Sequence, residues 1–147
     1  MKLRVLLVDD NLLILESLRM ILEAASDMEV VGVVANGARV LEEVANASPD
    51  VVCMDINIPD LNGIEATRQL LALHPKVKVI GLSVHTGLAS VVAMTIAGAT
   101  GFITKSDTGE LLQAIRMVSQ NQTYFSVGLR LKDAAELGRF AIGSTQA

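Results

Sequence analysis

The stretch Val5-Leu6-Leu7-Val8-Asp9-Asp10 is a short run of aliphatic residues that stops abruptly at two carboxylates. Four further short runs follow it along the chain, namely Val30–Val34, Val51–Met54, Val77–Leu82 and Gly101–Thr104. Short runs that are rich in Val and Ile and lack polar alternation are typical of strands buried on both faces of a parallel sheet. The last run is weak by itself, and its position in the series assigns it to a strand.

Segments of helical length lie between these runs. They are Leu12–Ala25, Arg39–Ala47, Gly63–Leu73, Leu88–Ala97 and Thr108–Gln120. Most of them repeat apolar residues every three or four positions, as Leu15, Leu18 and Leu22 do in the first. Strand and helix therefore alternate five times. Right-handed crossovers then predict an α/β fold in which a five-stranded parallel sheet has helices on both faces.

The composition favours one compact domain with an aliphatic core. The chain has 147 residues, of which 51% are hydrophobic and only 3% aromatic, and its mean hydropathy is +0.48. This length is enough to bury a core without disulfides. No apolar run approaches the roughly 20 residues that span a bilayer, and the N-terminus lacks the plan of a signal peptide. We therefore expect no association with a membrane.

Charge and cysteine content narrow the function classes further. The formal net charge is −4, and the chain has one cysteine. An acidic balance argues against a chain built chiefly to bind nucleic acid. One cysteine excludes an internal disulfide framework and fits a reducing cytoplasm. We expect a cytoplasmic protein in which Cys53 is a small buried hydrophobe rather than a reactive thiol.

Polar residues follow four of the predicted strands. Asp9 and Asp10 follow the first, Asp55 the third, Ser83 the fourth and Lys105 the fifth. Ligands of a doubly wound parallel sheet gather at the carboxyl ends of its strands, so we expect these five side chains at one rim. Three adjacent carboxylates repel one another unless a cation joins them. Mg²⁺ is such a cation, because it takes one or two carboxylates and keeps several waters.

This combination of groups is suited to receiving a phosphoryl group. Phosphoryl transfer depends chiefly on positioning and on neutralising charge on the equatorial oxygens, which a metal, an ammonium group and a hydroxyl supply. One of the carboxylates would be the nucleophile and would form an acyl phosphate. The sequence therefore predicts a phosphoryl acceptor.

Four motifs carry a resemblance to a known family. They are Asp9-Asp10 after a strand, Met54-Asp55-Ile56-Asn57-Ile58-Pro59-Asp60-Leu61-Asn62-Gly63, Leu82-Ser83, and Gly98-Ala99-Thr100-Gly101-Phe102-Ile103-Thr104-Lys105. Each motif is weak alone, but in this order and at these strand ends they are specific together. Over roughly residues 3–122 the sequence resembles the receiver domain of bacterial two-component response regulators.

Three phrases are most similar to one subgroup of that family. They are Leu82-Ser83-Val84-His85, Gly98-Ala99-Thr100-Gly101-Phe102 and Gln122-Thr123-Tyr124-Phe125-Ser126, which resemble the NarL/FixJ (LuxR-type) DNA-binding regulators. The resemblance implies a flavodoxin-like (CheY-like) doubly wound sheet with strand order 2-1-3-4-5 and five helices. Residues 1–125 are then the receiver domain. Residues 126–147 are a C-terminal tail or interdomain linker, with one weak amphipathic helix over Leu131–Ile142.

The resemblance implies a metal site beside the phosphoacceptor. Asp55 would accept the phosphoryl group from a histidine kinase. Asp10 would bind Mg²⁺ directly, and Asp9 would help to hold it through water. Asp55 would also be a ligand, and Asn57 would offer its backbone carbonyl, so that its side chain matters less.

The resemblance also implies the remaining roles at the rim. Ser83 and Lys105 would contact the phosphoryl oxygens. Phe102 would be a rotameric switch that turns inward when Ser83 is drawn toward the phosphate, although core packing is its plainer interpretation. Gly63 and Pro59 would shape the loop after Asp55, where Gly tolerates backbone angles that other residues resist.

The sequence departs from the family pattern at three points. Val84 is bulkier than the alanine that many receivers have after the hydroxyl residue, which narrows access to Asp55. Ser106 stands where many receivers have a proline after a cis bond. A cis bond to a non-proline residue costs roughly 2.5–4 kcal/mol, so we expect a trans peptide between Lys105 and Ser106. The chain also ends before the DNA-binding domain of the family.

Several residues have plainer alternative interpretations. The pair Asp9-Asp10 could cap a helix. Ser83 alone could be an ordinary satisfied polar residue, and Lys105 could be a solvated surface lysine. We favour the metal and phosphoryl roles because these residues share one predicted rim. For His85, two residues after Ser83, contact with the phosphoryl group and an inert position both stay open.

The resulting hypothesis is a phosphorylation-dependent signalling switch. The chain would bind its cognate histidine kinase, take the phosphoryl group on Asp55 and alter a dimer or partner interface. It would catalyse its own modification and slow self-dephosphorylation, but turn over no external substrate. It would control transcription through a DNA-binding domain absent from this chain, as a receiver cut from a longer regulator. The alternative is a stand-alone receiver that acts by protein contacts.

Hydrophobic residues beyond those needed to cover the sheet, called here the apolar surplus, predict where the chain associates. The segment Leu88–Ala97 has no charge, and some of Ala89, Ala93, Met94 and Ala97 should meet solvent or a partner. Leu12, Leu13 and Met20, together with Met117, suggest a second apolar patch. We expect a symmetric homodimer through the first and fifth helices or through the fourth.

Two rivals come from other functional classes. The phrase Asp55-Ile56-Asn57 is faintly similar to the Asp-x-Asp of haloacid-dehalogenase phosphatases, but here the order of nucleophile and acidic pair is reversed and no cap excludes water. A nucleotide-binding flavodoxin-like module would need a Gly-rich phosphate loop after the first strand, which the sequence lacks. Both rivals are therefore disfavoured.

Overall fold

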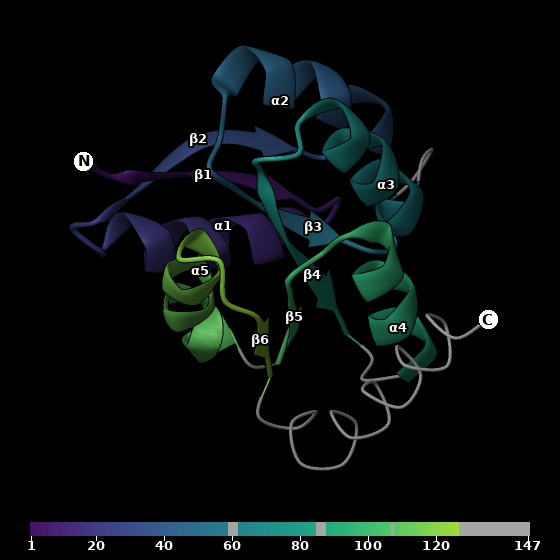
Figure 1. The fold of residues 1–147 in the computed structure, drawn as a ribbon. Helices are drawn as coiled ribbons and strands as arrows, with labels where there is room; N and C mark the ends of the chain where they lie inside the picture. Colours follow the sequence, from purple (N-terminus) through teal and green to yellow (C-terminus); the bar gives the residue numbers. More distant parts are fainter. Residues whose placement is uncertain (59–61, 85–87, 107, 127–147) are drawn as a thin grey trace.

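Six parallel strands form a single sheet in the described part of the chain (Figure 1). The structure, a computed structural model, describes residues 1–58, 62–84, 88–106 and 108–126. The strands are β1 (Leu3–Val8), β2 (Met28–Val34), β3 (Val51–Asp55), β4 (Lys78–Ser83), β5 (Gly101–Thr104) and β6 (Tyr124–Phe125). Their order is β2-β1-β3-β4-β5-β6. The predicted order 2-1-3-4-5 is confirmed, and β6 extends the sheet beyond the five predicted strands.

Each of the five predicted helices is present. They are α1 (Leu12–Glu23), α2 (Val40–Ala47), α3 (Gly63–Leu73), α4 (Leu88–Ala97) and α5 (Leu111–Ser119). Short 3-10 turns at Gly37–Arg39 and Thr108–Glu110 lead into α2 and α5, so these two helices begin later than predicted. The chain therefore follows the expected alternation of strand and helix.

The sixth strand is the element that the hydrophobic pattern did not predict. It pairs in parallel with β5, with Tyr124 opposite Gly101 and Phe125 opposite Phe102. Two residues are too few for a periodic pattern to be recognised. The last two residues of the predicted receiver domain, Tyr124 and Phe125, are thus part of the sheet. The boundary after residue 125 stays a prediction, and the predicted helix Leu131–Ile142 lies outside the described residues.

Two apolar cores lie on opposite faces of the sheet, because alternate residues of a strand point to opposite sides. In β1, Val5 and Leu7 pack with residues of α1 and α5, whereas Leu6 and Val8 pack with residues of α2, α3 and α4. Figure 1 shows the same division of the helices between the two faces. Burying each such side chain contributes roughly 1.5–3 kcal/mol. The aliphatic composition is therefore used mainly to cover both faces of the sheet.

Part of the apolar surplus stays at the surface. Leu12, Leu13 and Met20 of α1 are exposed, and so is Ile96 of α4. Met94, one of the α4 residues considered for exposure, is instead fully buried. Among the described residues, no helix has both the length and the apolar character needed to cross a bilayer.

Candidate functional site

The carboxyl ends of four strands bring together the residues that the sequence singled out. Asp9 and Asp10 follow β1, Asp55 ends β3, Ser83 ends β4 and Lys105 follows β5. Asp9, Asp55 and Ser83 are buried, whereas Asp10 is exposed to solvent. Each of the three carboxylates offers an oxygen within 4.8 Å of the other two. The structure thus places these residues at one edge of the sheet, as predicted.

Asp9 is held by contacts with three neighbours. Its Oδ1 accepts a hydrogen bond of 2.9 Å from the backbone N–H of Asn11, and its own N–H donates to the Val34 carbonyl at the end of β2. Its Oδ2 lies 2.6 Å from Nζ of Lys105. These contacts fix a fully buried carboxylate at the inner side of the rim.

Asn11, not the acidic pair, caps α1. Its Oδ1 accepts hydrogen bonds from the backbone N–H groups of Leu13 and Ile14, at 3.0 and 3.3 Å. A helix start leaves such N–H groups without partners inside the helix, so a side-chain acceptor stabilises it. The interpretation of Asp9 and Asp10 as helix caps is therefore wrong. Asn11 was not predicted as the cap, although Asn before an apolar periodic segment is a recognised capping signal.

Asp55 is a buried carboxyl with two partners. Its Oδ1 accepts a hydrogen bond of 3.0 Å from the N–H of Asn57 and lies 3.4 Å from Nζ of Lys105. Burial raises the pKa of Asp55 above its usual range, and the charge of Asp9 adds to that rise. The Asn57 N–H and the Lys105 ammonium group oppose it by favouring the charged form. The carboxyl group is therefore poorly solvated, but it faces a positive charge.

Lys105 is not a surface lysine. Only 11% of its side chain is exposed, and its ammonium group lies between Asp9 and Asp55. Its backbone N–H donates a hydrogen bond of 2.7 Å to the Ser83 carbonyl. The Lys105–Ser106 peptide is trans, as predicted, because the described residues contain no cis bond. The ends of β4 and β5 are thus joined at the rim, next to the two buried carboxylates.

Phe102 points into the core in this structure. It is 1% exposed, and its ring lies so close to Gly81 that a Cβ atom there would come within 3.0 Å of the Phe102 Cδ2. The same Cβ would lie 2.9 Å from Cε of Met94. Gly81 therefore provides the space that the inward ring occupies. That Phe102 changes rotamer stays a prediction.

Gly63 is required for a different reason from the one that we expected. A Cβ atom at this position would overlap the Asp55 carbonyl oxygen and would lie 2.6 Å from the Ile56 Cα. The Gly63 N–H also donates to the Ile56 carbonyl at 3.0 Å. Close approach of two backbones, rather than an unusual backbone angle, thus excludes a side chain here. Pro59 and His85 lie outside the described residues.

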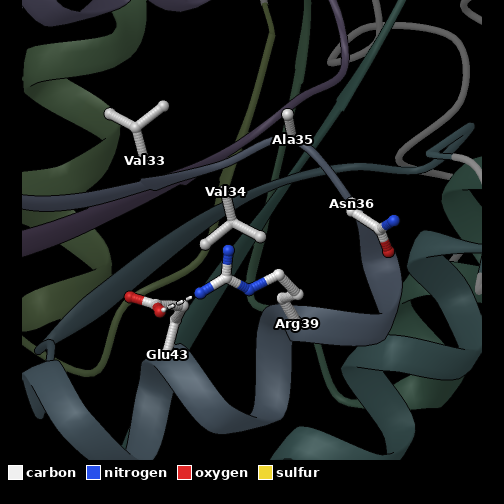
Figure 2. Close-up of a pocket in the computed structure, with 6 residues that line it drawn as sticks. All are labelled: Val33, Val34, Ala35, Asn36, Arg39 and Glu43. Carbon is white, nitrogen blue, oxygen red and sulfur yellow. Dashed lines mark hydrogen bonds and ion pairs between the residues drawn. The ribbon is translucent and has the colours of Figure 1, made fainter.

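A separate hollow of about 200 Å³ lies at the end of β2. Figure 2 shows its lining, in which Arg39 reaches across to Glu43, with 3.3 Å between the guanidinium nitrogen and the carboxylate oxygen. Arg39 is largely exposed. The residues described as lining this hollow include none of the three rim carboxylates. We therefore place the candidate site at the rim and not in this hollow.

The donor set at the rim fits a hard divalent cation. Carboxylate and carbonyl oxygens are the ligands that Mg²⁺ prefers in proteins. Asp9, Asp10 and Asp55 supply three carboxylates that could hold a metal ion. The exposed position of Asp10 leaves one side open to solvent, which suits an ion that keeps several of its waters.

Comparison with known proteins assigns the chain to a family. Residues 5–116 match the response regulator receiver domain family. The chain belongs to this family. It is 37% identical over 124 residues to the transcriptional regulatory protein DegU of Brevibacillus brevis, covering 84% of this chain and 52% of DegU. It is 38% identical over 124 residues to the response regulator GacA of Pseudomonas viridiflava, covering 84% of this chain and 58% of GacA.

A solved structure shows the same architecture. The receiver superposes with a TM-score of 0.87 on a LuxR-family two-component response regulator from Aurantimonas sp. SI85-9A1, to which it is 31% identical. That match covers 92% of this chain and 98% of the other. The predicted resemblance to receivers of the NarL/FixJ (LuxR-type) subgroup is confirmed. The chain spans little more than half the length of the two regulators named above.

Proposed function

We propose that this receiver accepts a phosphoryl group on Asp55 from a histidine kinase and thereby changes a surface that contacts a partner. The observation that supports it most directly is the placement of Lys105 Nζ, 2.6 Å from Asp9 and 3.4 Å from Asp55. An ammonium group held there can neutralise charge on a phosphoryl group bound to Asp55. The membership of the receiver family supports the same assignment.

Asp55 would act as the nucleophile. One carboxylate oxygen attacks phosphorus, the bond from phosphorus to the kinase histidine nitrogen breaks, and the histidine nitrogen keeps the electron pair. The hydrogen bond from the Asn57 N–H to Asp55 Oδ1 orients the carboxylate. The product is an acyl phosphate, and no proton has to leave Asp55 in its charged form.

Asp10, Asp9, Asp55 and the backbone carbonyl of Asn57 would hold Mg²⁺. When bound, the ion supplies positive charge that neutralises the phosphoryl oxygens. The Ser83 hydroxyl and the Lys105 ammonium group would bind phosphoryl oxygens from the side of β4 and β5. Withdrawal of Ser83 toward the phosphoryl group would favour the inward position that the Phe102 ring occupies in this structure.

The test is to phosphorylate the purified chain with a small acyl phosphate and Mg²⁺ and to measure the intact mass. We expect the wild type to gain one phosphoryl group that is lost in mild base, as an acyl phosphate is. Asp55→Asn should gain none. Asp50→Asn is the matched control, because Asp50 is exposed and directly precedes β3, at the opposite end of that strand from Asp55. Phosphorylation of Asp55→Asn at the wild-type rate would refute the proposal.

We further propose that the output is a change of association between protein surfaces in the cytoplasm. The exposed Leu12, Leu13 and Met20 of α1 support an interface through α1 and α5, and the exposed Ile96 supports one through α4. The names of DegU and GacA support control of transcription, which would need a DNA-binding domain outside this chain. The receiver itself would turn over no external substrate. Sedimentation with and without fluoroberyllate tests this output, and a monomer under both conditions would refute homodimerisation.

A further inference from the structure

The segment after α5 is tied to β5 by a continuous set of hydrogen bonds. The Tyr124 N–H donates to the Thr100 carbonyl and the Ser126 N–H donates to the Phe102 carbonyl, both at 3.0 Å. The Thr104 N–H donates to the Ser126 Oγ at 2.9 Å. At this last step a side-chain hydroxyl accepts the bond that a strand carbonyl would accept in a regular ladder. Ser126, which directly follows β6, therefore extends the pairing with β5 through a side-chain contact.

This contact lies one residue before Lys105. The Lys105 N–H donates to the Ser83 carbonyl on the other side of β5, at 2.7 Å. The backbone that carries the Lys105 side chain is thus held between β4 and Ser126. Thr104 and Ser126 are both buried, at 1% and 0% exposure, so water cannot readily replace the Ser126 hydroxyl.

Further contacts anchor the same segment to the domain. The Tyr124 hydroxyl donates a hydrogen bond to the Glu110 carboxylate at the start of α5. Phe125 packs against the core cluster that contains Phe102 and Met94. Ser126 therefore reaches Thr104 from a strand whose own position is fixed by packing.

We propose that Ser126 is a positioning residue for Lys105. The inference rests on the proposed function, because it assigns Ser126 a role at the same phosphorylation site. By accepting the Thr104 N–H bond, Ser126 holds the end of β5 so that the Lys105 ammonium group reaches Asp55. Small displacements of a group that stabilises a transition state are costly, and about 1 Å can lower a rate on the order of a hundredfold.

The coupling must work in both directions. If the Ser126 contact favours the arrangement of Lys105 that binds a phosphoryl group, then a bound phosphoryl group must strengthen the Ser126 contact by the same free energy. Phosphorylation would therefore strengthen the contact between β5 and the segment Tyr124–Ser126. Hydrogen exchange of the Ser126 N–H should slow when fluoroberyllate and Mg²⁺ are added.

The experiment compares Ser126→Ala with Ser119→Ala in the full chain. Ser119 also carries a hydroxyl that makes one hydrogen bond, to the Arg116 carbonyl, but at a partly exposed position at the end of α5. We expect Ser126→Ala to be phosphorylated by a small acyl phosphate about tenfold more slowly at saturating Mg²⁺. Its Thr104 and Lys105 amides should exchange faster, while its Mg²⁺ dissociation constant stays that of the wild type. Ser119→Ala should match the wild type in all three measurements.

Loss of a positioning contact should lower the phosphorylation rate and leave the Mg²⁺ affinity unchanged. General destabilisation of the site would lower both the rate and the Mg²⁺ affinity. An unchanged rate, or a lower rate without faster exchange at Thr104, overturns the inference while the proposed function stands. Absence of phosphorylation in the wild type overturns both. If Ser126→Ala does not fold, Ser126→Cys replaces it, because a thiol is nearly isosteric and a weaker acceptor. A phosphorylation rate of Ser126→Cys equal to that of the wild type overturns the inference.

Discussion

Lys105 places its ammonium nitrogen 2.6 Å from the buried Asp9 carboxylate. Removing one member of a buried ion pair leaves the other charge without compensation. We expect Lys105→Met, which keeps the apolar stem of the side chain, to lower the free energy of unfolding by about 3 kcal/mol in metal-free buffer. Urea unfolding followed by circular dichroism measures this change.

The matched control for Lys105 is Lys76→Met, because Lys76 is exposed and precedes β4 at the opposite end of the sheet. It should unfold at the wild-type urea concentration. Mg²⁺ should restore part of the stability that Lys105→Met loses, since a cation at the rim compensates the same carboxylates. Equal stability of Lys105→Met and wild type would show that the buried pair contributes nothing.

The raised pKa of Asp55 makes stability depend on pH. Because its folded pKa lies above the ordinary value of 3.8, the native state binds more protons than the unfolded state in the range between the two. Stability from this group is therefore present at low pH and is lost as pH rises through the folded pKa. We expect Asp55→Asn to be more stable than the wild type at pH 7 without metal, because the amide has no charge to be buried.

The difference between Asp55→Asn and wild type should shrink as pH falls and become smallest well below pH 3.8, where the wild-type carboxyl is largely protonated in both states. Unfolding free energies measured from pH 3 to pH 8 in the presence of a chelator give both curves. Glu16→Gln, which alters an exposed carboxylate of α1, is the control and should follow the wild type. A wild type that gains stability over Asp55→Asn as pH rises would contradict the raised pKa.

Gly63 allows Asp55 and α3 to pack closely. We expect Gly63→Ala to cost about 1–3 kcal/mol, because the added methyl group has to displace the backbone of Asp55 and Ile56. It should also slow phosphorylation, since Asp55 moves with its backbone. Gly109→Ala is the control, as a Cβ atom at Gly109 would meet nothing within 4 Å. Thermal unfolding and phosphorylation rates measure both effects: Gly63→Ala should unfold at a lower temperature and react more slowly than the wild type, whereas Gly109→Ala should match it.

The sequence predicted the fold and the rim because both depend on local patterns. Each buried strand is a short aliphatic run, and Asp9, Asp55 and Ser83 stand where such a run stops. Because parallel strands place their carboxyl ends at one edge of the sheet, those positions could be predicted to lie together without knowledge of any contact. The strand order came instead from the resemblance to receivers, and the structure and the similar solved receiver confirm it.

The parts that sequence analysis missed depend on contacts between a side chain and a distant backbone. The Ser126 hydroxyl meets the Thr104 N–H across 22 residues of chain, and no periodic pattern marks such a pair. Gly63 is required by the position of Asp55, eight residues earlier, which only the folded loop reveals. Hydrophobic periodicity locates elements, whereas contacts of this kind depend on how the elements pack.

Substitution of Asp10 should distinguish metal binding from folding, because it should weaken the first and leave the second unchanged. Its carboxylate is exposed yet has an oxygen within 4.8 Å of oxygens of Asp9 and Asp55. Mg²⁺ that binds only the native state should raise the free energy of unfolding by about 2.7 kcal/mol at a free concentration one hundred times the dissociation constant. We expect Asp10→Asn to lose most of this gain while keeping the stability of the metal-free wild type. Glu42→Gln, an exposed change on α2, should retain the full gain. Urea unfolding with a chelator and with Mg²⁺ gives each value, and an undiminished Mg²⁺ effect in Asp10→Asn would place the ion elsewhere.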